Sequence, residues 1–337
     1  MRLLRIALIA AVFFALPGVS ASAQEKPSDA LKLKKPEMAQ YQALTQLVDA
    51  VMTGKGQASG DVKLRLRPYF VKSSSSVYAP YVLEIGPGKF TSFPLAVYVR
   101  AVSRPAPAAA EGKGGYPFED IYFINDAKGL RPGAGDIVEV SRGLQLPPGE
   151  FDVYVGIAET PPRNKSAGFG RHVVHSQALT VPNLSTGLTT SSIMLASALD
   201  EAQQPLIGGN QLEQPFSFGG YRITPAPTST FSKSAELLFL FFIYNEAAGT
   251  GGKPDVDVNY FFSRAAESKP FSKAATSSFN EATLPKEFNV NAGHQLVVGQ
   301  GIPLESFAAG EYKLEIRITD KIANQTISRE VPFTVAP

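Results

Sequence analysis

Leu304-Glu-Ser-Phe-Ala-Ala-Gly-Glu-Tyr-Lys-Leu-Glu-Ile-Arg-Ile-Thr-Asp320 is the stretch that decides the fold. Within it Leu314, Ile316 and Ile318 alternate with polar residues, which is the period of a strand with one buried face. A polar turn follows, and then a second alternating run from Ile327 to Val335. We therefore predict a β-hairpin that closes an antiparallel β-sandwich.

An earlier copy of this hairpin begins near the middle of the chain. Gly-Glu-Phe at 149–151 corresponds to Gly-Glu-Tyr at 310–312, and Thr-Val at 180–181 corresponds to Thr-Val at 334–335. The loop of the first hairpin is seven residues longer, and the difference falls within Pro161 to Gly170. Two copies, each at the end of a series of strands, indicate a duplicated topology.

The expected fold is mainly β, with two antiparallel immunoglobulin-like β-sandwich domains and one short N-terminal helix. Its 29 Gly and 26 Pro suit short strands joined by many turns. The predicted organisation is a signal peptide at 1–23, a flexible lead and amphipathic helix at 24–56, a first sandwich at 57–182, a linker at 183–190 and a second sandwich at 191–337.

Charge and cysteine content exclude several classes of function. The chain has 32 basic and 30 acidic residues, and two of the basic ones, Arg2 and Arg5, lie in the expected leader. The remaining charges balance, so we expect no binding to nucleic acid. The absence of cysteine excludes disulfides and thiolate chemistry.

The first residues have the features of a secretory signal. Basic Arg2 and Arg5 precede an apolar run from Ile6 to Leu16, and Ala21-Ser22-Ala23 forms a small-residue cleavage site. We expect an exported protein, periplasmic or extracellular, whose mature chain begins at Gln24. After cleavage no apolar run is long enough to span a membrane as a helix.

An amphipathic helix is predicted after the leader, because apolar residues recur there at spacings of three and four. Pro36 can occupy its first turn, and Gly54 ends it. We expect this helix to pack on its own first domain; the alternative is a docking helix for a partner. The apolar stripe consists of Met38, Tyr41, Leu44, Val48, Val51 and Met52.

The run from Leu237 to Tyr244 is apolar on both faces, which a strand exposed on one side would not need. Its outer face must be covered by the first domain, by the segment 200–220 or by another protein. With two loops at 101–115 and 161–170, it provides the candidate interaction surface, whose residues are Leu238, Leu240, Phe242, Tyr244, Tyr116, Arg163 and Lys165.

No catalytic, cofactor or metal site is predicted. His172 and His175 are three apart on a predicted strand and so face opposite sides. Asp255, Asp257 and Asn259 start like a calcium loop, but Tyr260 occupies the position that requires glycine. We interpret the three residues as the polar side of a strand.

The sequence also resembles a known group. Gly-x-Tyr-x-Leu-x-Ile at 310–316 is similar to the penultimate strand of immunoglobulin-like and fibronectin-type-III-like sandwiches. The resemblance implies a hydrogen bond from Tyr312 to the backbone just upstream, which Phe151 could not make. The region 190–335 is similar to uncharacterised secreted bacterial proteins, some with a GWxTD domain, although no Gly-Trp signature is present here. The resemblance implies fold and export and supplies no activity.

The predicted function is that of an exported, non-catalytic interaction or scaffold protein of the cell envelope. Its predicted partner is another envelope protein, and the oligomeric state is left open. One alternative is a carbohydrate-binding module, for which an aromatic face would consist of Tyr78, Tyr81, Tyr116, Phe118 and Tyr122. A hydrolase with paired carboxylates is a further alternative.

Overall fold

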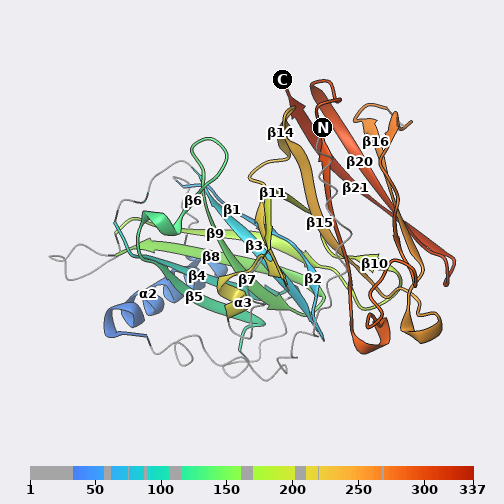
Figure 1. The fold of residues 1–337 in the computed structure, drawn as a ribbon. Helices are drawn as coiled ribbons and strands as arrows, with labels where there is room; N and C mark the ends of the chain where they lie inside the picture. Colours follow the sequence, from blue (N-terminus) through green and yellow to red (C-terminus); the bar gives the residue numbers. More distant parts are fainter. Residues whose placement is uncertain are drawn as a thin grey trace. The chain divides into compact units, whose positions relative to one another are not determined.

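The computed structural model describes residues 33–56, 62–74, 76–86, 90, 92–105, 115–160, 170–201, 210–218, 220–267 and 269–337. These residues form mainly antiparallel β-structure (Figure 1), which confirms the predicted β-sandwich class. The expected signal peptide lies outside the described residues, as do Arg163 and Lys165 of the candidate surface.

The chain divides into two compact units. The N-terminal unit contains the described residues up to Pro68 and those from 76 to Asn183. The C-terminal unit contains Leu184–Pro337 together with a short earlier segment, Tyr69–Ser74. The predicted domain and linker boundaries stay predictions.

In its described residues, the N-terminal unit has one helix, one short 3-10 turn and two sheets. One sheet has the strand order β1-β3-β7-β6, with β2 (Val71–Lys72) paired to β3, and the other has the order β5-β4-β8-β9. The elements are α2 (Lys35–Met52), β1 (Leu64–Pro68), β3 (Val77–Ile85), β4 (Leu95–Ser103), β5 (Phe118–Ile124), η1 (Ala127–Gly129), β6 (Arg131–Pro132), β7 (Val138–Leu146), β8 (Gly149–Glu159) and β9 (His172–Val181).

Side-chain contacts connect the two sheets of this unit at both edges. The amide of Gln177 on β9 accepts from the backbone N–H of Leu66 at 3.1 Å and donates to the carbonyl of Leu66 at 2.8 Å. At the other edge Arg142 on β7 donates to Asp120 on β5 at 3.1 Å. The sandwich is therefore closed by polar pairs as well as by its apolar interior.

Helix α2 packs on the outer face of the β5-β4-β8-β9 sheet, as expected. Tyr41, Leu44 and Val48 form one apolar cluster with side chains of that sheet, including Ala96 and Tyr98. Pro36 stands in the first turn, and Gly54 has the positive φ, 69°, that suits the residue after a helix end. Across the part of the chain that the structure describes, no helix is long and apolar enough to cross a membrane.

The C-terminal unit is built from two further sheets. The first has the order β10-β15-β11-β13-β12 with β19 paired to β15, and the second has the order β14-β21-β20-β16-β17 with β18 paired to β16. The elements of these sheets and their connections are β10 (Thr189–Thr190), β11 (Met194–Glu201), α3 (Asn210–Glu213), β12 (Ser217–Phe218), β13 (Tyr221–Pro225), β14 (Thr230–Ser232), β15 (Glu236–Tyr244), η2 (Thr250–Gly252), β16 (Val256–Arg264), β17 (Ser272–Lys273), β18 (Ser277–Phe279), η3 (Val290–Ala292), β19 (Leu296–Pro303), β20 (Gly310–Asp320) and β21 (Gln325–Ala336).

The inner face of β15 lies in the core of this unit. Leu237, Phe239, Phe241 and Ile243 belong to one buried cluster with the inward residues of β16, β20 and β21. Alternation along β15 places these four side chains on one face. One of the two apolar faces predicted for this strand is thus part of the sandwich core.

The two closing hairpins have corresponding registers. Gly149 pairs with Val181 and Phe151 with Leu179 in the first, as Gly310 pairs with Val335 and Tyr312 with Phe333 in the second. The matched residues of the two copies, Gly149 and Gly310 on one strand and Val181 and Val335 on the other, thus occupy equivalent places in the two ladders. The expected corner bond is also present in the second hairpin, where the Tyr312 hydroxyl donates to the Ala308 carbonyl at 2.7 Å.

Candidate functional site

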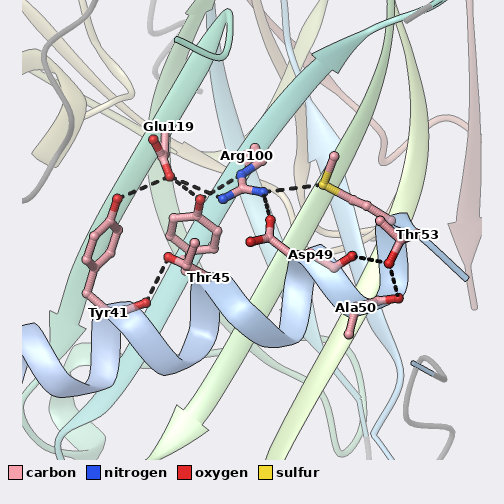
Figure 2. A network of polar contacts seen from close by, with 9 residues as sticks. Tyr41, Thr45, Asp49, Ala50, Thr53, Arg100 and Glu119 are labelled. Atoms are coloured by element: carbon pink, nitrogen blue, oxygen red, sulfur yellow. Dashed lines mark hydrogen bonds and ion pairs between the residues drawn. The ribbon is translucent and has the colours of Figure 1, made fainter. Parts of the chain in front are cut away.

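A connected network of polar side chains in the N-terminal unit surrounds the buried Arg100, beneath helix α2 (Figure 2). Arg100 is on β4 two residues after Tyr98, so both side chains point to the face of the sheet that the helix covers. The Arg100 side chain is only 1% exposed. A buried guanidinium requires charged or hydrogen-bonding partners, because loss of hydration is costly.

The guanidinium of Arg100 has a partner at each of its nitrogens. Nη1 donates to Oδ1 of Asp49 on the helix at 2.5 Å, and Nε donates to the hydroxyl of Tyr98 at 2.7 Å. Nη2 contacts Oε1 of Glu119 on β5 at 3.5 Å. The ring of Tyr116 lies 3.9 Å from the guanidinium carbon, within cation–π range.

Glu119 accepts hydrogen bonds on the other side of the cluster. Its Oε1 accepts from the hydroxyl of Tyr98 and from that of Tyr41 at 3.3 Å, in addition to the contact with Arg100. The Glu119 side chain is 11% exposed, whereas that of Asp49 is 51% exposed. The helix therefore contributes a solvent-accessible carboxylate and the sheet a mostly buried one, on opposite sides of one arginine.

The helix supplies its polar groups from one side. Figure 2 shows Tyr41, Thr45 and Asp49 following one another along α2, at the spacing of four that aligns side chains on a helix. The Thr45 hydroxyl donates to the carbonyl of Tyr41 at 2.9 Å. At the helix end, the Thr53 hydroxyl donates to the carbonyl of Asp49 at 2.9 Å.

The electrostatics of the cluster hold its groups in fixed protonation states. Burial, followed by the charge of Glu119, raises the pKa of Tyr41 to about 12. Burial raises the pKa of Tyr98 further, against the opposing effect of Arg100. Burial alone would lower the pKa of Arg100, but Tyr98 and Asp49 outweigh it and the pKa is raised. At neutral pH the tyrosines are thus donors and the arginine is charged, an arrangement that suits positioning rather than proton transfer.

Tyr116 is the residue of the predicted surface that this cluster includes. Its half-buried ring stacks on Arg100 and so anchors the start of β5 to β4. The structure does not bring Tyr116 together with the four β15 residues in one unit, because they belong to different units.

The four predicted residues on the outer face of β15 are largely buried. Leu238 is half-buried, and Leu240, Phe242 and Tyr244 are each at most 3% exposed. Phe218 packs edge-on against Phe242 at 5.5 Å between ring centres. The segment 200–220 therefore supplies part of the predicted cover. An interaction of Phe242 with another protein stays a prediction, and it would require displacement of Phe218.

The two aspartates of the calcium-like sequence at 255–259 form ion pairs with a lysine. Lys321 lies 3.1 Å from Oδ1 of Asp255 and 2.9 Å from Oδ2 of Asp257. The side chain of Asn259 accepts from the hydroxyl of Thr276. Within the described ranges, no group of three or more His, Asp or Glu side chains could hold a metal ion.

The aromatic set proposed for sugar stacking is mostly internal. Tyr78, Tyr81 and Phe118 are at most 4% exposed. The ring of Tyr122 lies under the guanidinium of Arg142 at 4.9 Å. Their placement corresponds to core packing and anchoring.

The Arg100 cluster was not predicted from the sequence. Two signals were available: Arg100 is a lone charge in the apolar run of β4, and Thr45 and Asp49 continue a line of polar groups from the hydroxyl-bearing Tyr41 of the apolar stripe. Neither signal specifies its partner, because pairing a helix line with a strand position requires the fold.

Comparisons with known proteins do not assign this site. No family model matches the chain, and no curated protein matches it. Among solved structures, the crystal structure of red sea bream transglutaminase aligns at 6% identity with a TM-score of 0.23. The alignment covers 86% of this chain and 33% of the transglutaminase, so the chain spans about a third of that protein's length. A similarity at this level carries no argument about fold or activity.

Proposed function

We propose that the protein is an exported, non-catalytic interaction or scaffold protein of the cell envelope, built from two immunoglobulin-like sandwiches. The observation that supports this proposal is that the buried charged side chains connect structural elements to one another. In the Arg100 cluster, the charged side chains join helix α2 to β4 and β4 to β5, and the hydroxyls of Tyr41 and Tyr98 are held protonated. Groups arranged in this way stabilise a surface for binding; they are not poised to exchange protons.

Other buried carboxylates are used in the same way. The Glu139 side chain is 1% exposed and lies between Arg67 at 3.2 Å and Arg131 at 2.5 Å. Asp320, which is fully buried, accepts backbone N–H groups of Ala247, Ile322 and Ala323. Both of these carboxylates are engaged by donors of the protein itself, which weighs against their use as the paired carboxylates of a hydrolase.

The carbohydrate-binding alternative is not favoured by the aromatic residues proposed for it. A stacking platform needs ring faces open to solvent, and Tyr78, Tyr81 and Phe118 are buried. Export and an envelope location rest on the signal-like leader at 1–23.

A two-stage binding experiment tests the proposal. The full chain, made with its leader and a C-terminal tag, is crosslinked in intact host cells and sought in separated cytoplasmic, periplasmic, membrane and medium fractions. A protein enriched over a tagged sandwich domain of similar size is then purified and titrated against the mature chain. The expected result is saturable binding, with the protein recovered outside the cytoplasm.

Two outcomes would overturn the proposal. One is recovery of the chain in the cytoplasm with its leader intact. The other is failure of every enriched protein to bind the purified chain, combined with turnover of a substrate by that chain in an activity screen. The variant Arg100→Met serves as a control, because it removes the bond that attaches helix α2 to the sheet. Binding through α2 should weaken in this variant, whereas binding through another surface should not change.

A further inference from the structure

Strand β21 forms a border of its sheet, and only its last residues have a strand beside them there. On one side β20 pairs with β21 from Gln325 to Val335. On the other side β14 pairs in parallel with residues 334–336 only. Within the ranges that the structure describes, no strand pairs with this second side of residues 325–333. Most of the border is therefore open.

The backbone groups that face this border can be assigned from Thr334. Its N–H donates to the backbone just before β14 at 2.9 Å, so it points away from β20. Backbone groups alternate sides along a strand, and the same side therefore carries those of Thr326, Ser328, Glu330 and Pro332. Proline has no N–H to offer. We call the N–H and C=O groups of the other three, Thr326, Ser328 and Glu330, the open border.

The side chains of the open border are bonded to β20 and do not fold over the border. All three residues are exposed. In chain order, their partners on β20 are Thr319 at 3.1 Å, Glu315 at 3.1 Å and Lys313 at 3.0 Å. These contacts hold the side chains toward the middle of the sheet and leave the backbone groups free to meet another strand.

One group of the open border has a partner in its own unit. The Ser328 carbonyl accepts from Nη1 of Arg329 at 3.0 Å. A carbonyl oxygen has two lone pairs, so it can accept a strand bond as well. Among the described residues, the three N–H groups of the open border have no acceptor. An unpaired row of backbone groups is a template for pairing with another chain.

The open border extends equally far on both sides of Ser328. Asn324, which has a φ of 51° in the hairpin turn, ends it in one direction. Pro332, which lacks the donor, ends it at an equal distance in the other direction. When two copies of this strand lie antiparallel with their Ser328 residues opposite each other, the turn of each copy meets the proline of the other. The border is thus self-complementary in length.

The same register suits the side chains. Glu330 stands opposite Thr326 of the other copy, and Arg329 stands opposite Ile327, so no like charges face each other. A register shifted by two residues in either direction would place Pro332 or the turn opposite the open border, and bonds would be lost. One register is therefore favoured over its neighbours.

We propose that the open border is a self-association surface, which pairs with the open border of a second copy of this chain, antiparallel about a two-fold axis at Ser328. Each of the three residue pairs exchanges N–H···O=C bonds in both directions. The contact uses the same surface on both copies and closes on itself, so it yields a dimer and no longer assembly. It goes beyond the proposed envelope function and does not depend on it, because both partners are this chain.

The pairing is short, so the dimer is expected to be weak. Three residue pairs with little apolar burial correspond to a dissociation constant of roughly 10–100 µM. Sedimentation equilibrium of the purified full chain over this concentration range measures it directly.

Two variants of Ser328 test the role of the backbone. Ser328→Pro removes the central N–H of both copies and should raise the dissociation constant about 30-fold. Ser328→Ala is the matched control: it loses the same hydroxyl, keeps the N–H and should bind within about twofold of the parent. The natural proline at 332 faces the same side of the strand, so the ladder with β20 already accommodates such a ring.

Thiol crosslinking tests the register, and the absence of cysteine from the chain makes each introduced thiol unique. A mixture of Thr326→Cys and Glu330→Cys should be joined by a short bis-maleimide, since these positions face each other in the dimer. Either variant alone should not be joined, because its two thiols lie roughly 13 Å apart along the strands. Ser272→Cys, exposed on β17 at the other border of the sheet, is the control.

Dimerisation that rises with concentration and weakens in Ser328→Pro, together with crosslinking in the mixture, would support the surface. Three results would overturn it: a parent chain that stays monomeric far above this concentration range, equal dimerisation of Ser328→Pro and Ser328→Ala, or crosslinking of Ser272→Cys as efficient as that of the mixture. If Ser328→Pro does not fold, crosslinking of the mixture decides the question.

Discussion

Gly149 and Gly310 share a backbone φ of 149° and stand at the first position of β8 and of β20. This conformation is open to glycine and strained for other residues. A Cβ at Gly310 would find its nearest neighbour at 3.4 Å and one at Gly149 at 3.6 Å, so space is not what restricts these positions. The same backbone requirement at both sites explains why the two hairpins begin with the same residue.

Gly310→Ala is expected to destabilise the C-terminal unit by about 1–3 kcal/mol through backbone strain. Gly149→Ala should have a similar effect on the N-terminal unit. Gly220→Ala is the matched control, because that position has open space and no positive φ. Chemical unfolding curves for the three variants provide the measurement. Equal stability of all three would contradict the strain argument.

Tyr312→Phe should cost about 1–2 kcal/mol, because it leaves the Ala308 carbonyl without the hydroxyl that now donates to it. The ring stays in place against Phe307 and Phe333, so packing is preserved. Phe151 at the corresponding position shows that the first hairpin pairs in the same register without such a hydroxyl. If the urea unfolding midpoint of the variant equals that of the parent protein, the Tyr312–Ala308 hydrogen bond contributes nothing to stability.

Arg100→Met is expected to destabilise the N-terminal unit by about 3 kcal/mol, because Glu119 would lose its buried countercharge. Asp49→Asn should cost about 1 kcal/mol, since half of the Asp49 side chain is in water. Arg104→Met breaks an exposed pair with Asp152 and should cost the least of the three, because water screens that pair. Thermal unfolding of the three variants and amide exchange of helix α2 measure the order of these costs. A different order would contradict the assignment of the buried charges.

Glu246 should make stability depend on pH near neutrality. Burial, with a further contribution from Asp320, raises the pKa of its carboxyl from 4.5 to about 7. The folded state thus holds the proton more tightly than the unfolded state, so stability from this group is present below pH 4.5 and is lost as pH rises through 7.

Glu246→Gln removes this loss. The variant is expected to be more stable than the parent by up to about 3 kcal/mol at pH 8, which is the value of the shift in free energy. The advantage should disappear at pH 4. Unfolding curves of both proteins across this range supply the test, and a constant difference would refute the assignment to Glu246.

Phe241→Asp should prevent folding of the C-terminal unit, because it places a charge among the fully buried residues of its core. Phe271→Asp is the control: that side chain is 53% exposed and its replacement should cost less than about 1 kcal/mol. Circular dichroism and protease resistance distinguish the two. A folded Phe241→Asp variant would contradict the placement of β15.

Most of the fold follows from local patterns that the sequence displays. Alternation in β20 and the spacing of Tyr41, Leu44 and Val48 predict a strand and a helix, since each depends on residues close together in the chain. The repeated Gly-Glu-aromatic start predicts corresponding hairpins for the same reason.

The candidate site could not be predicted in the same way. Arg100 meets Asp49 and Glu119 only after a helix has crossed a particular pair of strands. Burial of Phe242 likewise depends on the irregular segment that carries Phe218. Contacts of this kind depend on tertiary packing, which has no periodic signal.

The side chain of Gln177 has a consequence for behaviour at high concentration. Its amide bonds both backbone groups of Leu66 and so occupies the place that a residue of an adjacent strand would take. A strand from another molecule would have to displace this amide before it could extend the sheet at β1. By this means a single glutamine protects that point of the sheet border against fibril-like growth.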